Sequence, residues 1–198
     1  MLRNVSGGGL PSEYQQVEWI RNPNNEYIKT DFIPNDPDIV INCEYHYDSQ
    51  PGDWSTVFGA YGNLYMVHIY RRAARAFRWG NFSSGNIEQT WDTNHHEIVL
   101  SKNGAFFDGV QDWSASLSAA ASNIELFLFC QNYYGDADYS SKGLCMESFS
   151  ITKNGVYIIN MIPCYHISDG IVGMYDLARN RFFYSNRGGN FEKGADVN

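Results

Sequence analysis

The sequence predicts an all-β domain, built as a two-sheet antiparallel β-sandwich. Aromatic residues make up 16% of the 198-residue chain and charged residues only 18%, a balance that favours pleated, half-buried strands over exposed helices. About a dozen short apolar runs are separated by Gly, Asn, Asp and Pro, and no convincing amphipathic helix interrupts them. A chain of this length fits one such domain.

The N-terminal residues 1–9 end in Ser6-Gly7-Gly8-Gly9, which has almost no side chain to bury and predicts a flexible Gly-rich linker. A phosphate-binding glycine loop would need a helix after it, and Leu10–Tyr14 offers none. The domain is therefore expected over residues 10–198, with an upstream domain attached through the linker.

The expected strands follow from apolar alternation, from β-branched and aromatic content, and from the turn residues between them. Ile39–Tyr47 is the clearest, because every second side chain is apolar and predicts one buried face. Asn103-Gly104 and Asn154-Gly155 lie between apolar runs and predict tight hairpins, since both residue types accept positive φ. The predicted strands are residues 14–20, 27–33, 39–47, 56–60, 64–70, 77–79, 96–100, 105–107, 124–130, 146–151, 156–162, 171–175 and 182–184.

Three further expectations concern irregular positions. Pro163 is expected to end the strand before it, because proline has no N–H for a sheet ladder. Beyond the Ser168–Gly170 turn, the last two predicted strands form a closing hairpin. Ile124–Cys130 is apolar on nearly both faces, as a central strand can be, and Ser114–Ser122 allows at most a short helical turn.

Four segments of the chain together carry a family resemblance. In chain order they are LPSEYQQVEWI with YIKTDFIP, HHEIVLSKNGAFFDG, IELFLFCQNYYGD and PCYHISDGIVGMYDLARNRFFYSNRGGNFEKG. Together they resemble the concanavalin A-like (laminin-G-like) jelly-roll domains of bacteriophage tail and gut-bacterial surface proteins, over residues 10–194. The resemblance implies a jelly roll that binds a carbohydrate or a host-surface receptor, carried on a virion or an extracellular or cell surface. It implies no particular ligand, since this fold hosts lectins, glucanases and structural modules.

Catalysis is not expected from the sequence patterns. The E-x-D-x-E pattern of glucanases is absent, and the acids two residues apart, Asp36/Asp38 and Asp136/Asp138, stand in turn-like sequence. Such aspartates are expected to form Asx turns, with calcium binding as the open alternative, although no specific motif supports it. A glycoside hydrolase or lyase whose acids meet only in three dimensions stays a second hypothesis, and a purely structural virion or interaction domain a third.

The histidines and cysteines predict no cofactor. His95 and His96 are adjacent on a predicted strand, so their side chains point to opposite faces and are not expected to share a metal ion. The four cysteines have no C-x-x-C spacing and are expected to be buried free thiols rather than a disulfide.

Sugar binding needs aromatic faces that stack on pyranose rings and polar groups that bind hydroxyls. The Asn132–Tyr139 loop is the first choice, because its aromatic and polar groups are contiguous and too rich in turn residues for a strand. Arg71, Arg72, Arg75 and Arg78 fall in one hairpin, which is either a positive patch for an anionic glycan or a solvated edge. The candidate ligand-binding residues are Trp54, Arg72, Arg75, Trp79, Trp91, Asn132, Tyr133, Tyr134, Asp136, Asp138 and Tyr139.

The charge and hydropathy of the chain limit the classes of partner that it is expected to bind. A net charge of −8 disfavours nucleic acid and anionic membranes. No apolar run approaches the roughly 20 residues that span a bilayer, so membrane insertion is not expected. A glycan or a host-surface receptor is the expected partner, and the oligomeric state is left open.

Overall fold

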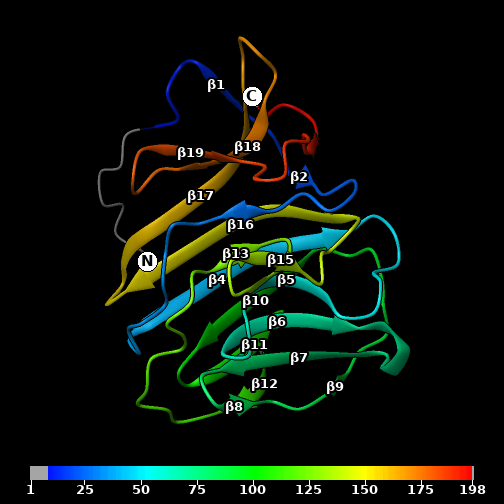
Figure 1. Ribbon diagram of the computed structural model, residues 1–198, viewed down its shortest axis with the longest axis vertical. Coiled ribbons are helices and arrows are strands. Elements are labelled where there is room, and N and C mark those ends of the chain that lie inside the picture. The colour runs from blue at the N-terminus through cyan, green and yellow to red at the C-terminus, as the bar shows by residue number, and fades with distance from the viewer. Residues whose placement is uncertain (1–8, 198) are drawn as a thin grey trace.

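The computed structural model describes residues 9–197 and shows two β-sheets packed face to face (Figure 1). The predicted all-β, two-sheet sandwich is confirmed. Within residues 9–197 the helical structure is one 3-10 turn, η1 (Tyr70–Arg72). These residues contain no helix that is long and apolar enough to cross a membrane. The linker predicted over residues 1–9 lies, apart from Gly9, outside the described residues.

The larger sheet is antiparallel and has the order β12-β11-β10-β4-β16-β17-β18-β19. Strand β1 pairs with β17, and β2 lies between β16 and β20. Its strands are β1 (Tyr14–Gln16), β2 (Ile20–Arg21), β4 (Ile39–Tyr47), β10 (His96–Ser101), β11 (Gly104–Phe107), β12 (Val110–Ser114), β16 (Leu144–Lys153), β17 (Val156–His166), β18 (Val172–Asp176), β19 (Arg181–Tyr184) and β20 (Glu192–Lys193).

The smaller sheet has the order β15-β14-β5-β6-β7-β8, with β13 joined to β3 and β5, and β9 to β7. Its pairs among residues 9–197 are antiparallel except β14 with β5, which is parallel. Its strands are β3 (Ile28–Lys29), β5 (Ser55–Ala60), β6 (Leu64–Ile69), β7 (Ala74–Trp79), β8 (Phe82–Ser83), β9 (Ile87–Glu88), β13 (Phe127–Leu128), β14 (Gln131–Tyr133) and β15 (Asp136–Asp138).

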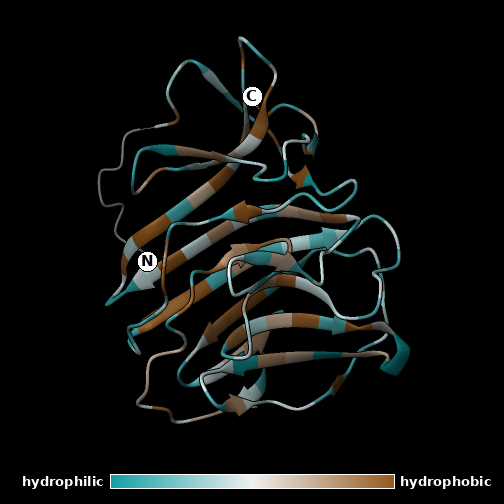
Figure 2. Ribbon diagram, viewed as in Figure 1, coloured by the Kyte–Doolittle hydropathy of each residue, from teal (hydrophilic) through white to brown (hydrophobic). Residues whose placement is uncertain are grey.

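The core lies between the two sheets. Strand β4 buries every second residue from Ile39 to Tyr47, as its alternation predicts. Phe58 of β5 meets Phe149 of β16 edge to face, with ring centroids 5.8 Å apart, so the two sheets are in direct contact. Figure 2 shows hydrophobic residues concentrated on the central strands and hydrophilic residues in the connecting loops.

The prediction that Pro163 ends its strand is wrong, because β17 continues to His166. Pro163 stands opposite Met174 of β18, and its carbonyl accepts a hydrogen bond from the Val17 N–H at 3.0 Å. A residue in a strand directs its C=O and N–H to the same side, so the missing donor faces the end of the short strand β1. The ladder to β18 therefore loses no bond.

The segment from Ile124 to Tyr139 also differs from its prediction. Only Phe127–Leu128 of the apolar run forms a strand, and Phe129 then adopts a φ of 68°. The expected irregular loop is a tight hairpin of β14 and β15, whose two turn residues, Tyr134 and Gly135, both have positive φ. The possible helical turn over Ser114–Ser122 does not form.

Candidate functional site

The outer face of the smaller sheet carries a hollow of about 280 Å³. Side chains at alternate positions of β6, Tyr65 and Val67, point away from the core. Their cross-strand neighbours on β7 are Arg78 and Ala76, which share this face. We call this site the aromatic hollow; its lining residues are Trp54, Thr56, Tyr61, Gly62, Tyr65, Val67, Arg78, Gln131 and Tyr139.

Trp54 and Tyr139 form one wall of the aromatic hollow, and Thr56 holds both in place. The Thr56 N–H donates to the Tyr139 carbonyl at 3.0 Å, and the Thr56 hydroxyl donates to the Trp54 carbonyl at 3.2 Å. The two aromatic rings lie 6.2 Å apart and tilted by 44°. These bonds order the backbone that carries both rings, which lowers the conformational entropy that is lost when a ligand binds.

Three aromatic residues at or beside the aromatic hollow are exposed and have strained backbones. Trp54 and Tyr139 are 41% and 47% exposed, and Tyr134 on the nearby hairpin is 72% exposed. Their φ angles are 64°, 49° and 50°, a region that bulky side chains rarely adopt. Strained residues of this kind cluster at binding sites, where the surrounding structure holds them in place.

The tip of the β14–β15 hairpin adds two more rings. Tyr61 lines the aromatic hollow, and its ring centroid lies 4.4 Å from that of Tyr133 and 5.1 Å from that of Tyr134. The Tyr61 N–H donates to the Asn132 carbonyl at 2.8 Å, which ties the hairpin to the end of β5. The hairpin thus extends the aromatic surface beyond the hollow.

The polar lining offers hydrogen-bonding groups and one positive charge. Arg78 donates from Nε to the Gly80 carbonyl at 3.0 Å and forms no ion pair with any residue in the range 9–197. The amide of Gln131 and the hydroxyls of Tyr61 and Tyr65 are further donors and acceptors. This set of groups can stack on a flat ring and hydrogen-bond its substituents.

A second hollow of about 270 Å³ lies at the η1 end of β6, and its lining includes the inward-facing His68 as well as Ile69, Ala74, Gln89 and Trp91. Ile69 and Val67 are two residues apart on the same face of β6, and with Ala76 they form one apolar strip. Gln89 Oε1 and Trp91 Nε1 are buried without a hydrogen-bond partner among the described residues.

The structure brings four of the candidate residues to the aromatic hollow and a fifth to the second hollow. Trp54 and Tyr139 line the aromatic hollow, Tyr133 and Tyr134 contact its Tyr61, and Trp91 lines the second hollow. The Asn132–Tyr139 segment supplies three of them, although as a hairpin and not as a loop.

Other candidates have structural contacts instead. Trp79 is buried in the core and donates from Nε1 to the Ala119 carbonyl at 3.1 Å. Asn132 is buried, with its amide bonded to the Glu125 carbonyl and to the Gly135 N–H. Asp138 accepts the Tyr139 N–H at 2.9 Å, and Asp136 is exposed on β15. Asp138 therefore helps set the backbone of Tyr139 rather than lining the hollow.

The four hairpin arginines do not form one patch. Arg75 and Arg78 are three residues apart on β7, so they point to opposite faces of the sheet. Arg75 is buried against Asp112 of β12, with Nε 2.6 Å from Oδ2, whereas Arg71 and Arg72 are exposed in η1. Only Arg78 reaches the aromatic hollow.

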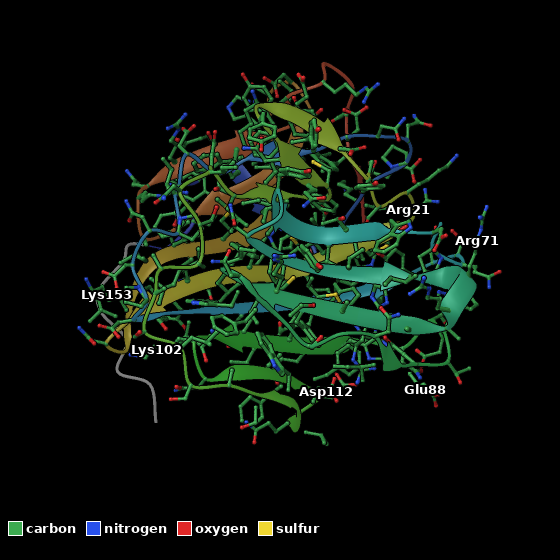
Figure 3. The ribbon with its side chains drawn as sticks, turned by 60° about the horizontal axis from the view of Figure 1, so that its bottom comes forward. Arg21, Arg71, Glu88, Lys102, Asp112 and Lys153 are labelled. Atoms are coloured by element: carbon green, nitrogen blue, oxygen red, sulfur yellow. The ribbon has the colours of Figure 1, made fainter. Side chains whose placement is uncertain are left out.

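The Asp36 and Asp38 carboxylates lie at a different end of the molecule. Asp36 Oδ1 accepts the Asp38 N–H at 2.9 Å, which is the expected Asx turn, and the two acids pair with Lys153 and Lys102. Figure 3 shows these two lysines together at one end and Arg71 at the other. The lysine charges offset those of the two aspartates.

The remaining thiols and histidines behave largely as expected. The four cysteines are free and buried, and burial raises the pKa of Cys145 and Cys164 to about 12. His95 and His96 do point to opposite faces. However, His95 meets His46 and Glu147 from two other strands, a group of potential metal ligands that local sequence spacing does not show.

Sequence reasoning also missed Tyr61, Tyr65 and Gln131 as lining residues. The alternation of β6 was a signal for Tyr65, since it lies between the inward-facing Leu64 and Met66. Tyr61 and Gln131 had no such signal, because the parallel pairing of β14 with β5 brings them together.

Comparison with known proteins gives no assignment. No family model matches the chain, and no curated protein sequence matches it. The function of the domain is therefore inferred from the geometry of its hollows and from the side chains that line them.

Proposed function

We propose that this domain is a non-catalytic binding module that takes a glycan on the outer face of its smaller sheet. The observation that carries the proposal is the aromatic hollow, where exposed and strained Trp54 and Tyr139 stand over a floor with Arg78 and Gln131. Indole and phenol rings stack on the apolar faces of pyranoses, and amide and guanidinium groups bind hydroxyls and carboxylates.

The extent of the apolar strip favours a chain of sugars over a single one. The aromatic hollow alone, at about 280 Å³, is close to the lower limit of small-molecule sites. The apolar strip continues from Val67 to Ile69, which also lines the second hollow at the end of β6. An oligosaccharide lying along β6 would contact both hollows.

The resemblance to concanavalin A-like domains of phage tails and bacterial surfaces agrees with this proposal. We extend the proposal to the partner and the location of the domain. A glycan or a glycosylated receptor on a host surface would be the partner, with the domain displayed on a virion or a cell surface. The lining groups are suited to stacking and hydrogen bonding, the interactions a binding module uses.

The test is a glycan array with neutral and acidic oligosaccharides, followed by calorimetry on the best ligands. Binding that falls at least tenfold in Trp54→Ala and Tyr139→Ala supports the proposal. Phe106→Ala is the matched control, because Phe106 is an exposed aromatic residue on β11 of the other sheet. Its affinity is expected to equal that of the parent.

Two results would overturn the proposal in favour of its alternatives. Shortened oligosaccharides detected by mass spectrometry after incubation would indicate a hydrolase or lyase. An array without signal above background, together with a defined oligomer in light scattering, would indicate a structural or interaction domain.

A further inference from the structure

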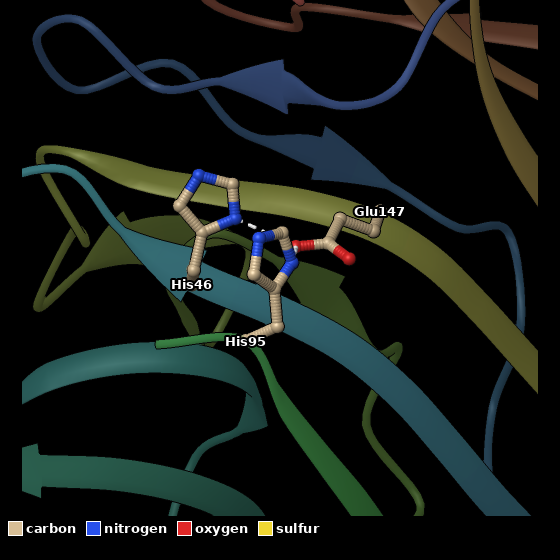
Figure 4. A group of neighbouring side chains, drawn as sticks. All are labelled: His46, His95 and Glu147. Carbon is tan, nitrogen blue, oxygen red and sulfur yellow. Dashed lines mark hydrogen bonds and ion pairs between the residues drawn. The ribbon is translucent and has the colours of Figure 1, made fainter. Parts of the chain in front are cut away.

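The outer face of the larger sheet holds three potential metal ligands that converge on one point (Figure 4). His46 Nδ1 lies 2.6 Å and His95 Nδ1 2.5 Å from the same Glu147 oxygen, Oε1. The two imidazole rings are 4.6 Å apart. This face lies on the other side of the sandwich from the aromatic hollow.

The fold builds this cluster from three strands. His46 is an outward position of β4, the strand between β10 and β16, and His95 directly precedes β10. Glu147 sits at a register shift of β16, between Met146 and Ser148. Because a bulge adds one residue, Glu147 and Ser148 both face outward while Met146 stays in the core.

The surroundings of the cluster are acidic. Glu44 of β4 stands directly opposite Glu97 of β10, and both side chains are exposed. Glu44 also accepts a hydrogen bond from the Ser148 hydroxyl at 2.9 Å, next to Glu147. Like charges in register on neighbouring strands repel one another, and a bound cation would relieve that repulsion.

We propose that His46, His95 and Glu147 form a Zn²⁺-binding site. Two imidazoles and one carboxylate suit zinc, whereas calcium and magnesium prefer oxygen ligands only. Ligand atoms around a tetrahedral zinc ion lie about 3.3 Å apart, so the carboxylate and the imidazoles need to separate by less than about 1 Å. The exposed ring of His95 has room for this movement.

The burial of the three side chains suggests how the ion would be held. His46 and Glu147 are 13% and 20% exposed and form the floor, whereas His95 is 71% exposed. The ring of Trp19 packs edge-on against His46 at 6.0 Å. Three protein ligands leave one tetrahedral position for water or for a group from a partner.

The test is titration of the metal-stripped, tag-free protein with ZnCl₂ by calorimetry and with CoCl₂ by visible absorption. We expect one ion per chain and the intense absorption bands of tetrahedral Co²⁺. His95→Ala and Glu147→Gln should each weaken binding at least about tenfold, since loss of a ligand costs no less than loss of an outer partner. Circular dichroism verifies that both variants fold.

The matched control is His166→Ala. His166 pairs with the Asp169 carboxylate at 3.0 Å, but no second imidazole joins this pair. Removal of the His166 ring should therefore leave the affinity for zinc unchanged. Equal binding by the parent and His95→Ala, or equal loss in His166→Ala, would overturn the proposal. The result is independent of glycan binding, because the two sites lie on different sheets.

Discussion

The rings of Trp54 and Tyr139 lie 6.2 Å apart at the aromatic hollow, and both residues hydrogen-bond to Thr56 through their carbonyls. Two residues 85 positions apart are thus joined at one residue of β5, through its N–H and its hydroxyl. Their positive φ angles cost folding energy, which an exposed aromatic residue does not recover through burial in the core. The arrangement is best explained by what these rings contact outside the protein.

Trp54→Gly should separate binding from stability. Glycine adopts a φ of 64° without strain, which offsets its larger loss of backbone entropy on folding. We expect the free energy of unfolding to stay within about 1 kcal/mol of the parent value while glycan affinity falls at least about tenfold. Urea denaturation and calorimetry measure the two quantities, and a variant that keeps full affinity would contradict the role of the indole.

Arg78→Met should discriminate between acidic and neutral glycans. A charge-assisted hydrogen bond contributes about 1.5–3 kcal/mol, so loss of the guanidinium should weaken binding of carboxylated or sulfated ligands by about tenfold or more. Neutral ligands, which form no ion pair with the guanidinium, should lose less. Affinities from calorimetry on one ligand of each kind provide the comparison.

Arg72→Met is the control for this prediction, because Arg72 is exposed in η1 and does not line the aromatic hollow. It should bind both ligands as the parent does. An equal loss in Arg72→Met would mean that the arginine-rich hairpin attracts the ligand through its general charge.

The fold class could be read from the sequence because strand periodicity and turn residues are local signals. The burial of β4 follows its alternation residue by residue, and both Asn-Gly hairpins form. Pro163 misled the prediction because its effect depends on which neighbour its missing N–H faces, and that is a property of the sheet. Short strands such as β13 and β14 are likewise defined by pairing with β5 and not by their own composition.

The candidate site was only partly predictable for the same reason. A position next to a turn correctly indicated that Trp54, Tyr133 and Tyr139 lie at the surface, since turns lie there. The same indication was wrong for Trp79, which is the last residue of a strand and faces the core. The His46, His95 and Glu147 cluster required strand order and a bulge, neither of which local sequence contains.

Arg75→Ala should destabilise the domain, because it leaves Asp112 partly buried without its partner. The pair joins β7 of one sheet to β12 of the other, and the guanidinium also stacks on the Phe107 ring at 3.9 Å. Removal of one member of a buried pair costs about 3–5 kcal/mol, and the slight exposure of both side chains favours the lower value. Urea denaturation measures the loss.

The double variant Arg75→Met/Asp112→Leu tests the cause of that loss. Replacing both charges by apolar side chains removes the uncompensated carboxylate, so we expect stability within about 1 kcal/mol of the parent. If the double variant is as unstable as Arg75→Ala, packing of the arginine stem is responsible and not the charge.

His68 should make the domain sensitive to acid. Its Nε2 lies 2.7 Å from the Tyr45 hydroxyl between the sheets, and burial, aided by nearby His96 and Arg75, lowers its pKa from 6.5 to about 3. The unfolded chain binds a proton below pH 6.5 and the folded chain does not. This contribution to stability is therefore complete above pH 6.5 and is lost as the pH falls toward 3, by about 1.4 kcal/mol per pH unit.

The His68→Gln variant isolates this contribution from that of the acidic residues, which titrate in both proteins. Glutamine can accept a hydrogen bond from the Tyr45 hydroxyl but binds no proton. The free energy of unfolding of the variant should therefore fall less steeply than that of the parent as the pH is lowered from about 6.5 to 4. Parallel curves for the parent and His68→Gln would show that His68 is protonated without cost in the folded state.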